Sequence, residues 1–198
     1  MKKTRLILVR HGRVENHATN RINGHIDVGI DELGVKQMHA VSARLEDEAI
    51  DYVYCSDLSR CVRGAAIISQ DRGLAYLKDN NFRELNMGSW DGLTYQEIQD
   101  NYPDELANRL ADLVNFRIPG GESLLDLQNR VMPKLHHLLD IHKYQTILLL
   151  AHAGVNRIIL CQALGLDLCQ VFRLGQDYGC INIIDYYDDD TVVFKLNA

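Results

Sequence analysis

The chain of 198 residues lacks any excess of basic side chains: 21 lysines and arginines stand against 27 aspartates and glutamates, a net charge of -6. We therefore expect no nucleic-acid partner and no anionic membrane surface, because the chain carries no overall positive charge to neutralise their phosphates. A long hydrophobic segment is also missing near the N-terminus. The apolar run at residues 6–9 is too short for a signal-peptide core or a membrane span.

The sequence also has no pattern of paired cysteines. The cysteines are odd in number and contain no C-x-x-C pair, which indicates neither a disulfide framework nor a zinc site: Cys55, Cys61, Cys161, Cys169 and Cys180. A reducing, cytoplasmic location is the expectation.

No cluster of metal-ligating residues is evident, so we expect neither a metal nor a cofactor. Repeats and linkers are absent too, and residues 1–198 are predicted to form one domain.

The order of apolar segments predicts an α/β fold. Strands are expected at residues 6–9, 51–54, 75–77, 146–150, 181–186 and 191–196. Helices are expected at residues 35–48, 57–70, 122–142 and 155–164, with Asp57 as an N-cap and a kink or break at Pro133. Short helical patterns at 94–101 and 104–114 form an irregular, cap-like segment at about 84–121. We predict a three-layer α/β/α sandwich with a mostly parallel central sheet.

Two histidines occupy equivalent places in this pattern. His11 follows the first strand and His152 follows the clearest one, and each is trailed by a glycine, Gly12 and Gly154. Because the carboxyl ends of parallel strands carry the ligand sites of α/β sheets, we expect the two side chains to meet there. Arg10 precedes His11 directly, and an arginine beside an imidazole at such an edge indicates a phosphate site.

A series of motifs resembles the histidine phosphatase superfamily, also called the phosphoglycerate mutase-like family. They read L-V-R-H-G at 8–12, R-I-N-G at 21–24, S-D-L-S-R at 56–60, F-R-E-L-N-M-G-S-W-D-G at 82–92, P-G-G-E-S at 119–123 and A-H-A-G at 151–154. Each motif alone is weak, but their shared order is specific and covers nearly the whole chain.

The resemblance implies a reaction and a role for each central residue. His11 is the nucleophile that forms a phosphohistidine, and Arg10, Arg60 and His152 stabilise the phosphoryl oxygens. Glu84 protonates the leaving oxygen and later takes a proton from water. Further phosphate contacts are expected from Gly12, Asn16 and Ala153, with His17 as the alternative to Asn16. A substrate pocket is expected from Asn23, Gly24, Arg83 and Trp90.

Each of these residues also has a purely structural interpretation. Arg60 taken alone fits a helical ion pair with Asp57, and Glu84 fits a solvated pair with Arg83. The chain also departs from the family pattern, because Arg13 and Val14 stand where an acid and a threonine are usual, and Gly64 replaces a threonine. These departures leave open whether the site retains full activity.

Three functions are compatible with these observations. The compact chain favours a phosphatase acting on a small phosphorylated metabolite, because mutases of this family are longer. The block at 83–92 is similar to that of the α-ribazole phosphatases of cobalamin biosynthesis, which makes α-ribazole 5′-phosphate one candidate substrate. The alternatives are phosphoglycerate mutase-type transfer and a non-catalytic module that binds a phosphorylated ligand. The sequence leaves the oligomeric state open, with a homodimer as one option.

Overall fold

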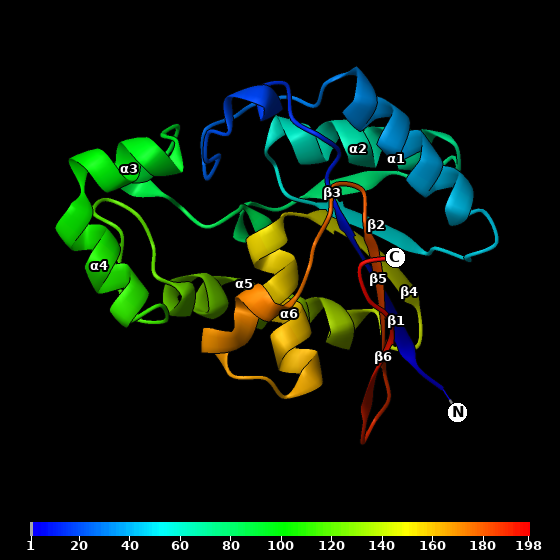
Figure 1. Ribbon diagram of the computed structural model, residues 1–198. Helices are drawn as coiled ribbons and strands as arrows, with labels where there is room; N and C mark the ends of the chain where they lie inside the picture. Colours follow the sequence, from blue (N-terminus) through cyan, green and yellow to red (C-terminus); the bar gives the residue numbers. More distant parts are fainter. Residues whose placement is uncertain (1) are drawn as a thin grey trace.

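The computed structural model describes residues 2–198, and its centre is a six-stranded sheet (Figure 1). The strands are β1 (Thr4–Arg10), β2 (Tyr52–Cys55), β3 (Tyr76–Lys78), β4 (Thr146–Ala151), β5 (Ile181–Tyr186) and β6 (Thr191–Lys195), in the order β3-β2-β4-β1-β5-β6. The first four in this order run parallel, whereas β5 and β6 pair antiparallel at one edge. The sheet is therefore mostly parallel, as predicted.

Helices cover both faces of the sheet, which confirms the three layers. Helices α1 (Glu32–Arg44) and α2 (Ser59–Gln70) lie on one side, and α5 (Leu124–Ile141) and α6 (Ala153–Leu164) lie on the other (Figure 1). The alternation along β1 explains how one strand serves both cores. Ile7 and Val9 join the core under α1 and α2, while Leu6 and Leu8 join the core under α5 and α6.

The segment between β3 and α5 leaves the sheet and forms a separate lobe. It contains helices α3 (Tyr95–Asn101) and α4 (Pro103–Ala111) and the short 3-10 helices η2 (Asn80–Phe82) and η3 (Gly88–Trp90). Two other 3-10 helices, η1 (His17–Thr19) and η4 (Leu168–Arg173), lie in the loops after β1 and α6. The lobe stands beside the ends of β1 and β4, where it can wall a ligand site (Figure 1).

Two local predictions about helices are wrong. Asp57 is not an N-cap: α2 begins at Ser59, Leu58 holds the cap position without a side-chain bond, and the Asp57 carboxylate binds Arg83 instead. The break predicted as one alternative at Pro133 is absent, because α5 runs unbroken past this residue, whereas a kink there stays a prediction. That helix begins later than predicted, at a capping box in which Ser123 and Asp126 bond each other's backbone N–H groups.

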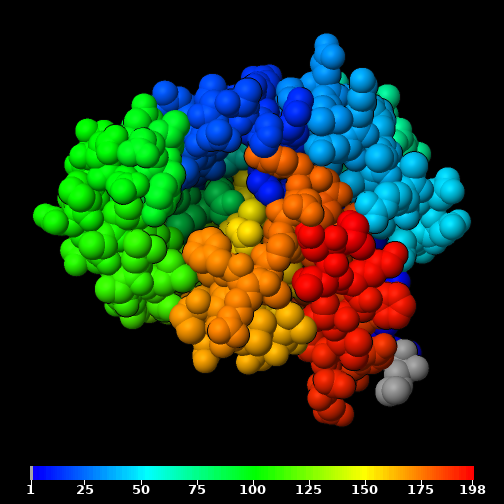
Figure 2. Space-filling view, in the orientation of Figure 1, coloured from blue at the N-terminus to red at the C-terminus, as the bar shows by residue number. Residues whose placement is uncertain are grey.

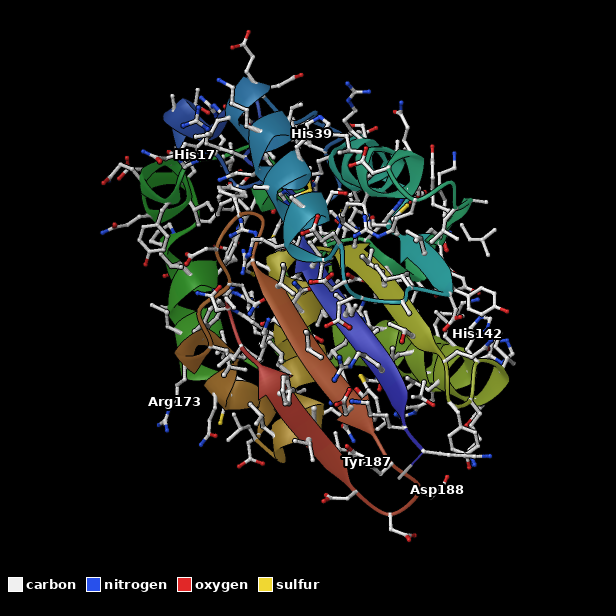
Figure 3. All side chains as sticks on the ribbon, turned by 90° about the vertical axis from the view of Figure 1, so that its right-hand side faces the viewer. His17, His39, His142, Arg173, Tyr187 and Asp188 are labelled. Atoms are coloured by element: carbon white, nitrogen blue, oxygen red, sulfur yellow. The ribbon has the colours of Figure 1, made fainter. Side chains whose placement is uncertain are left out.

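The last two strands form a hairpin at the antiparallel edge. Figure 3 shows Tyr187 and Asp188 at its tip, well apart from the His17 end of the molecule. Asp188 pairs with Lys143 at 3.2 Å, and both side chains are exposed. The acidic turn therefore lies at the surface.

Candidate active site

The pairing of β1 with β4 brings the two sequence-predicted histidines together. Arg10 and Ala151 are register partners at the carboxyl ends of these parallel strands, so the next residues, His11 and His152, leave the sheet side by side. Their ring centroids lie 5.1 Å apart with the planes at 64°. Both side chains are buried.

The surroundings of His11 make it a neutral ring with one free lone pair. Its Nδ1 lies 2.8 Å from the carbonyl oxygen of Gly12, which can only accept, so Nδ1 carries the proton and Nε2 does not. Burial, followed by the charges of Arg10 and Arg60, holds the pKa of His11 well below its usual range. Nε2 can therefore act as a nucleophile at neutral pH.

His152 has the opposite tautomer. The Nε–H of Arg60 donates to its Nδ1 at 3.2 Å, and because a guanidinium only donates, the proton of the neutral ring stands on Nε2. Burial first, and then the charges of Arg60, His11 and Arg10, hold the pKa of His152 well below its usual range. Nε2–H is thus a donor, and it lies 3.4 Å from the buried Cys61 thiol.

Arg60 is a buried member of the site and does not pair with Asp57. Its side chain is 1% exposed, and its guanidinium donates to the carbonyl oxygens of Gly24 at 2.7 Å and Ile26 at 2.9 Å. The carboxylate of Asp57 is occupied by two hydrogen bonds from Arg83, of 2.7 and 2.6 Å. The loop after β1 therefore fixes the Arg60 guanidinium beside both histidines.

Arg10 is held differently, against an aromatic ring. Its guanidinium stacks over Tyr178 at 3.9 Å and donates to the carbonyl oxygen of Gln176 at 2.5 Å. Its Nε is buried and has no partner among the described residues. A cation held on a π face keeps its donors available to a phosphate, and Tyr178 was not singled out from the sequence.

The side chain of Glu84, from the loop after η2, reaches the N-terminus of helix α6. One carboxylate oxygen accepts a hydrogen bond from the backbone N–H of the next residue, Leu85, at 2.8 Å. The other accepts from the backbone N–H of Gly154 at 3.1 Å. A methyl group on Gly154 would collide with this carboxylate. The glycine after His152 thus lets the acid reach the second-histidine motif, and Glu84 does not form the solvated pair with Arg83.

A cavity of about 530 Å³ opens over these residues. Figure 2 shows the hollow between the green lobe of α3 and α4 and the orange segment around η4. Arg10, His11, Arg60 and Glu84 line one end of it, together with Asn23 and Trp90 from the predicted pocket. The remaining lining is largely apolar, and several of its side chains come from the lobe and η4: Tyr95, Ile98, Leu106, Leu110, Leu113, Val171 and Phe172.

Six sequence-predicted site residues do not line this cavity, and one of them is His152, which is fully buried beside His11. Arg83 binds Asp57, which corrects its assignment to the substrate pocket. Gly12 packs so closely on the backbone of Gly34 that no Cβ would fit. The others stand behind the lining: Asn16 exchanges two amide hydrogen bonds with Asn23, Gly24 accepts from Arg60, and Ala153 begins α6. His17, the alternative to Asn16, packs edge-on against Tyr178 at 5.6 Å.

The three departures from the family pattern have plain structural roles. Arg13 forms an ion pair with Asp31 at 2.7 Å and does not line the cavity. Val14 is buried and lines the cavity with its apolar side chain. Gly64 packs on the Met38 side chain of α1, where a Cβ would lie 2.7 Å from the sulfur. None of the three replaces a residue at the end of the cavity that Arg10, His11, Arg60 and Glu84 line, which we call the phosphate end.

Two further observations concern metal ligands and helix hydropathy. Among residues 2–198, no three histidine, cysteine, aspartate or glutamate side chains are grouped so that they could hold a metal ion. Within the same residues, none of the helices has the length and hydropathy needed to cross a bilayer.

Comparison with known families identifies the class. A family model for the histidine phosphatase superfamily (branch 1) matches residues 6–198, and the chain belongs to this family. Phosphoserine phosphatase 1 of Hydrogenobacter thermophilus is 30% identical over 193 residues, 98% of this chain and 92% of its own. A probable phosphoglycerate mutase of Yersinia pestis is 33% identical, over 91% of this chain and 84% of its own.

Solved structures show the same architecture. The α-ribazole phosphatase of Shigella flexneri has a TM-score of 0.90 and 25% identity, covering 98% of this chain and 96% of its own. The fold and the order of the motifs thus agree with the resemblance seen in the sequence.

Proposed function

We propose that the chain hydrolyses a phosphate monoester of a small metabolite through a phosphohistidine on His11. The observation that carries the proposal is the state of His11: a buried, neutral ring whose Nδ1–H is bound by Gly12 and whose pKa is lowered partly by Arg10 and Arg60. A neutral nucleophile beside two permanent cations suits attack on a dianionic phosphate.

The proposed reaction has two steps at phosphorus. In the first, Nε2 of His11 attacks phosphorus and the ester oxygen departs, taking a proton from the Glu84 carboxyl group. In the second, water attacks the phosphohistidine, Glu84 takes its proton, and phosphate leaves as Nε2 regains its lone pair. The guanidinium groups of Arg10 and Arg60 and the Nε2–H of His152 would stabilise the oxygens around phosphorus in both steps.

Hydrolysis is favoured over mutase-type transfer by the shape of the cavity. The hollow is open at the molecular surface in Figure 2, so water can reach its floor. A mutase must instead keep its phosphohistidine from water while the substrate turns round. Because the relatives include both a phosphatase and a probable mutase, phosphate release and isomerisation must be measured side by side.

The apolar outer part of the cavity favours an ester with an apolar body. Three exposed apolar side chains, Tyr95, Leu110 and Phe172, stand at its rim. α-Ribazole 5′-phosphate, with its aromatic base, is one such ester, and a role in cobalamin biosynthesis is the hypothesis attached to it. A solved relative carries the α-ribazole phosphatase name, which supports including that substrate in the test.

The test is phosphate release from a panel of monoesters by the wild-type protein and by His11→Asn. The panel contains p-nitrophenyl phosphate, phosphoserine, 3-phosphoglycerate and α-ribazole 5′-phosphate, and 3-phosphoglycerate is also assayed for isomerisation. We expect release that is lost in His11→Asn and kept in His39→Asn, whose exposed histidine lies on α1. Isomerisation without release would favour the mutase, and tight phosphate binding without either reaction would favour a binding module.

We also propose a cytoplasmic location. All five cysteines are free thiols, and Cys169 alone among them is exposed. Free thiols without a disulfide are typical of a reducing compartment. Fractionation of the cells that express the chain tests this, with recovery in a secreted fraction as the contrary result.

A further inference from the structure

One cation in the cavity has no part in handling the phosphate. Arg109 lies on α4, within the lobe, whereas the phosphate end of the cavity is built at the carboxyl ends of β1 and β4 (Figure 1). Its side chain is only 8% exposed, although it lines the cavity. A buried arginine needs an explanation, because removing a guanidinium from water is costly unless an anion or hydrogen-bond acceptors replace the water.

Arg109 has no such replacement within residues 2–198. Its Nη1 is buried without a hydrogen-bond partner, and no carboxylate there forms an ion pair with it. Burial lowers the pKa of Arg109, with no contribution from a neighbouring charge of that part of the chain. Nη1 of the guanidinium therefore has no partner of its own in a wall that also contains Leu106, Leu110 and Leu113.

The other arginines that line the cavity are all bound to something. Arg10 and Arg60 donate to backbone carbonyls at the phosphate end. Arg21 forms an ion pair with Glu97 at 3.0 Å, and Arg157 donates through Nε to the carbonyl oxygen of Leu174 at 2.9 Å. Arg109 is thus unlike its neighbours, and the difference points to a partner that enters with the ligand.

We propose that Arg109 binds a second anionic group of the substrate, a carboxylate or a phosphate, separated from the reacting phosphate by an apolar spacer. The inference rests on the proposed phosphatase function and narrows its substrate class. The apolar lining between the two ends of the cavity would hold the spacer, and a guanidinium presents paired donors to either kind of oxyanion. α-Ribazole 5′-phosphate, whose base carries no acid group, would lack this contact.

The test uses phenyl phosphates that differ only at the far end. The para substituent is a chain of one to four methylenes that ends in a carboxylate, a phosphonate or a neutral carboxamide. For wild type we expect kcat/KM to favour an acid over its carboxamide by about tenfold or more at the best spacer length, the size of one charge-assisted hydrogen bond. If the carboxylate gives the higher kcat/KM, Arg109 binds a carboxylate; if the phosphonate does, Arg109 binds a phosphate group.

Variants then assign the preference to one residue. Arg109→Gln should bring the ratio of acid to carboxamide close to one, and Arg109→Lys should keep part of it. Arg117→Gln is the matched control, because Arg117 lies in an exposed ion pair with Asp126 outside the cavity and its loss changes the net charge equally. The control should keep the wild-type ratio. Since each ratio is taken within one variant, a change in overall activity does not affect it.

The outcomes separate this inference from the proposed function. Turnover that depends on His11 but shows no preference at any spacer length would overturn the Arg109 site and leave the phosphatase intact. Absence of turnover would contradict the phosphatase, and calorimetry with the matching benzylphosphonates then decides the site. The Arg109 site is supported if wild type binds the acid more tightly than the carboxamide and Arg109→Gln loses this difference. Equal binding of acid and carboxamide by wild type overturns the Arg109 site.

Discussion

His11 and His152 are neighbours in space with opposite proton positions. Gly12 holds the proton of His11 on Nδ1, while Arg60 donates to Nδ1 of His152 and so leaves the proton of that ring on Nε2. One ring therefore offers a lone pair and the other a donor. This division of roles follows from what each partner can do, since a carbonyl only accepts and a guanidinium only donates.

The proposed acid role of Glu84 leads to a prediction about leaving groups. Glu84→Gln removes the transferable proton but keeps a side chain of the same shape. We expect kcat/KM for alkyl phosphates to fall by about a hundredfold or more, and for p-nitrophenyl phosphate to fall much less, because nitrophenolate leaves without protonation. Glu46→Gln, at an exposed position after α1, should leave both substrates unaffected. Equal losses on both substrates in Glu84→Gln would contradict the assignment.

At the scale of an element, the first turn of α6 joins the second histidine to the acid. His152 holds the position before the helix, and the N–H of Gly154 binds the Glu84 carboxylate. Carboxylates are favoured at this end of a helix by the exposed N–H groups and the dipole. The carboxyl end of β4 and the start of α6 thus bring together a hydrogen-bond donor, His152, and the anchored carboxylate of the proposed acid, Glu84.

Gly154→Ala tests this arrangement, and its effects on stability and activity should differ. The new methyl group would displace the Glu84 carboxylate, which is the mobile end of a side chain, so the fold should persist. Alanine is also favoured over glycine in a helix, by up to about 1 kcal/mol. We expect unchanged or higher thermal stability with kcat/KM on alkyl phosphates lowered about tenfold or more. Full activity would show that Gly154 does not set the position of the acid.

The elements were predicted well where one segment contains its own signal. The apolar run of β1 and that of β4 marked buried strands, and both histidines followed from them. The start of α2 was mistaken because Asp57 resembles an N-cap, while its partner Arg83 is distant in sequence. The helix beginning at Glu32 was placed late because its cap, Asp31, lies in a polar stretch that resembled a loop.

At the scale of the whole molecule, burying two neutral histidines makes stability depend on pH. The unfolded chain binds protons at these rings below a pH of about 6.5, whereas the folded chain resists protonation because both pKa values are lowered. Stability should therefore fall as pH drops below that value. Each ring adds up to about 1.4 kcal/mol per pH unit to the slope of the unfolding free energy.

Denaturant titrations between about pH 5 and 6, just below the usual pKa of histidine, check this prediction. His11→Asn or His152→Asn should lower the slope by about one proton. His39→Asn is the control, because its exposed ring gives no reason for a change in slope. A slope that is the same in all four proteins would show that the two buried rings take up protons in the folded state.

The walls of the cavity were the part that the sequence did not reveal. Tyr178, Arg109 and Phe172 come from separate segments, a loop before β5, the lobe and η4, and meet only in the folded chain. No local pattern distinguishes an arginine in a polar helix that will face a cavity from one that will face water. The phosphate end was predictable because its residues follow strands and stand in ordered motifs.

The central claim is that His11 carries the phosphoryl group during turnover, and trapping that group tests it most directly. The protein is mixed with p-nitrophenyl phosphate, quenched in alkali within milliseconds to preserve phosphohistidine, digested and analysed by mass spectrometry. We expect an added phosphoryl group on the peptide that contains His11, absent when the quench is acidic and absent in His11→Asn. A phosphoryl group on another residue, or turnover that continues in His11→Asn, would contradict the account.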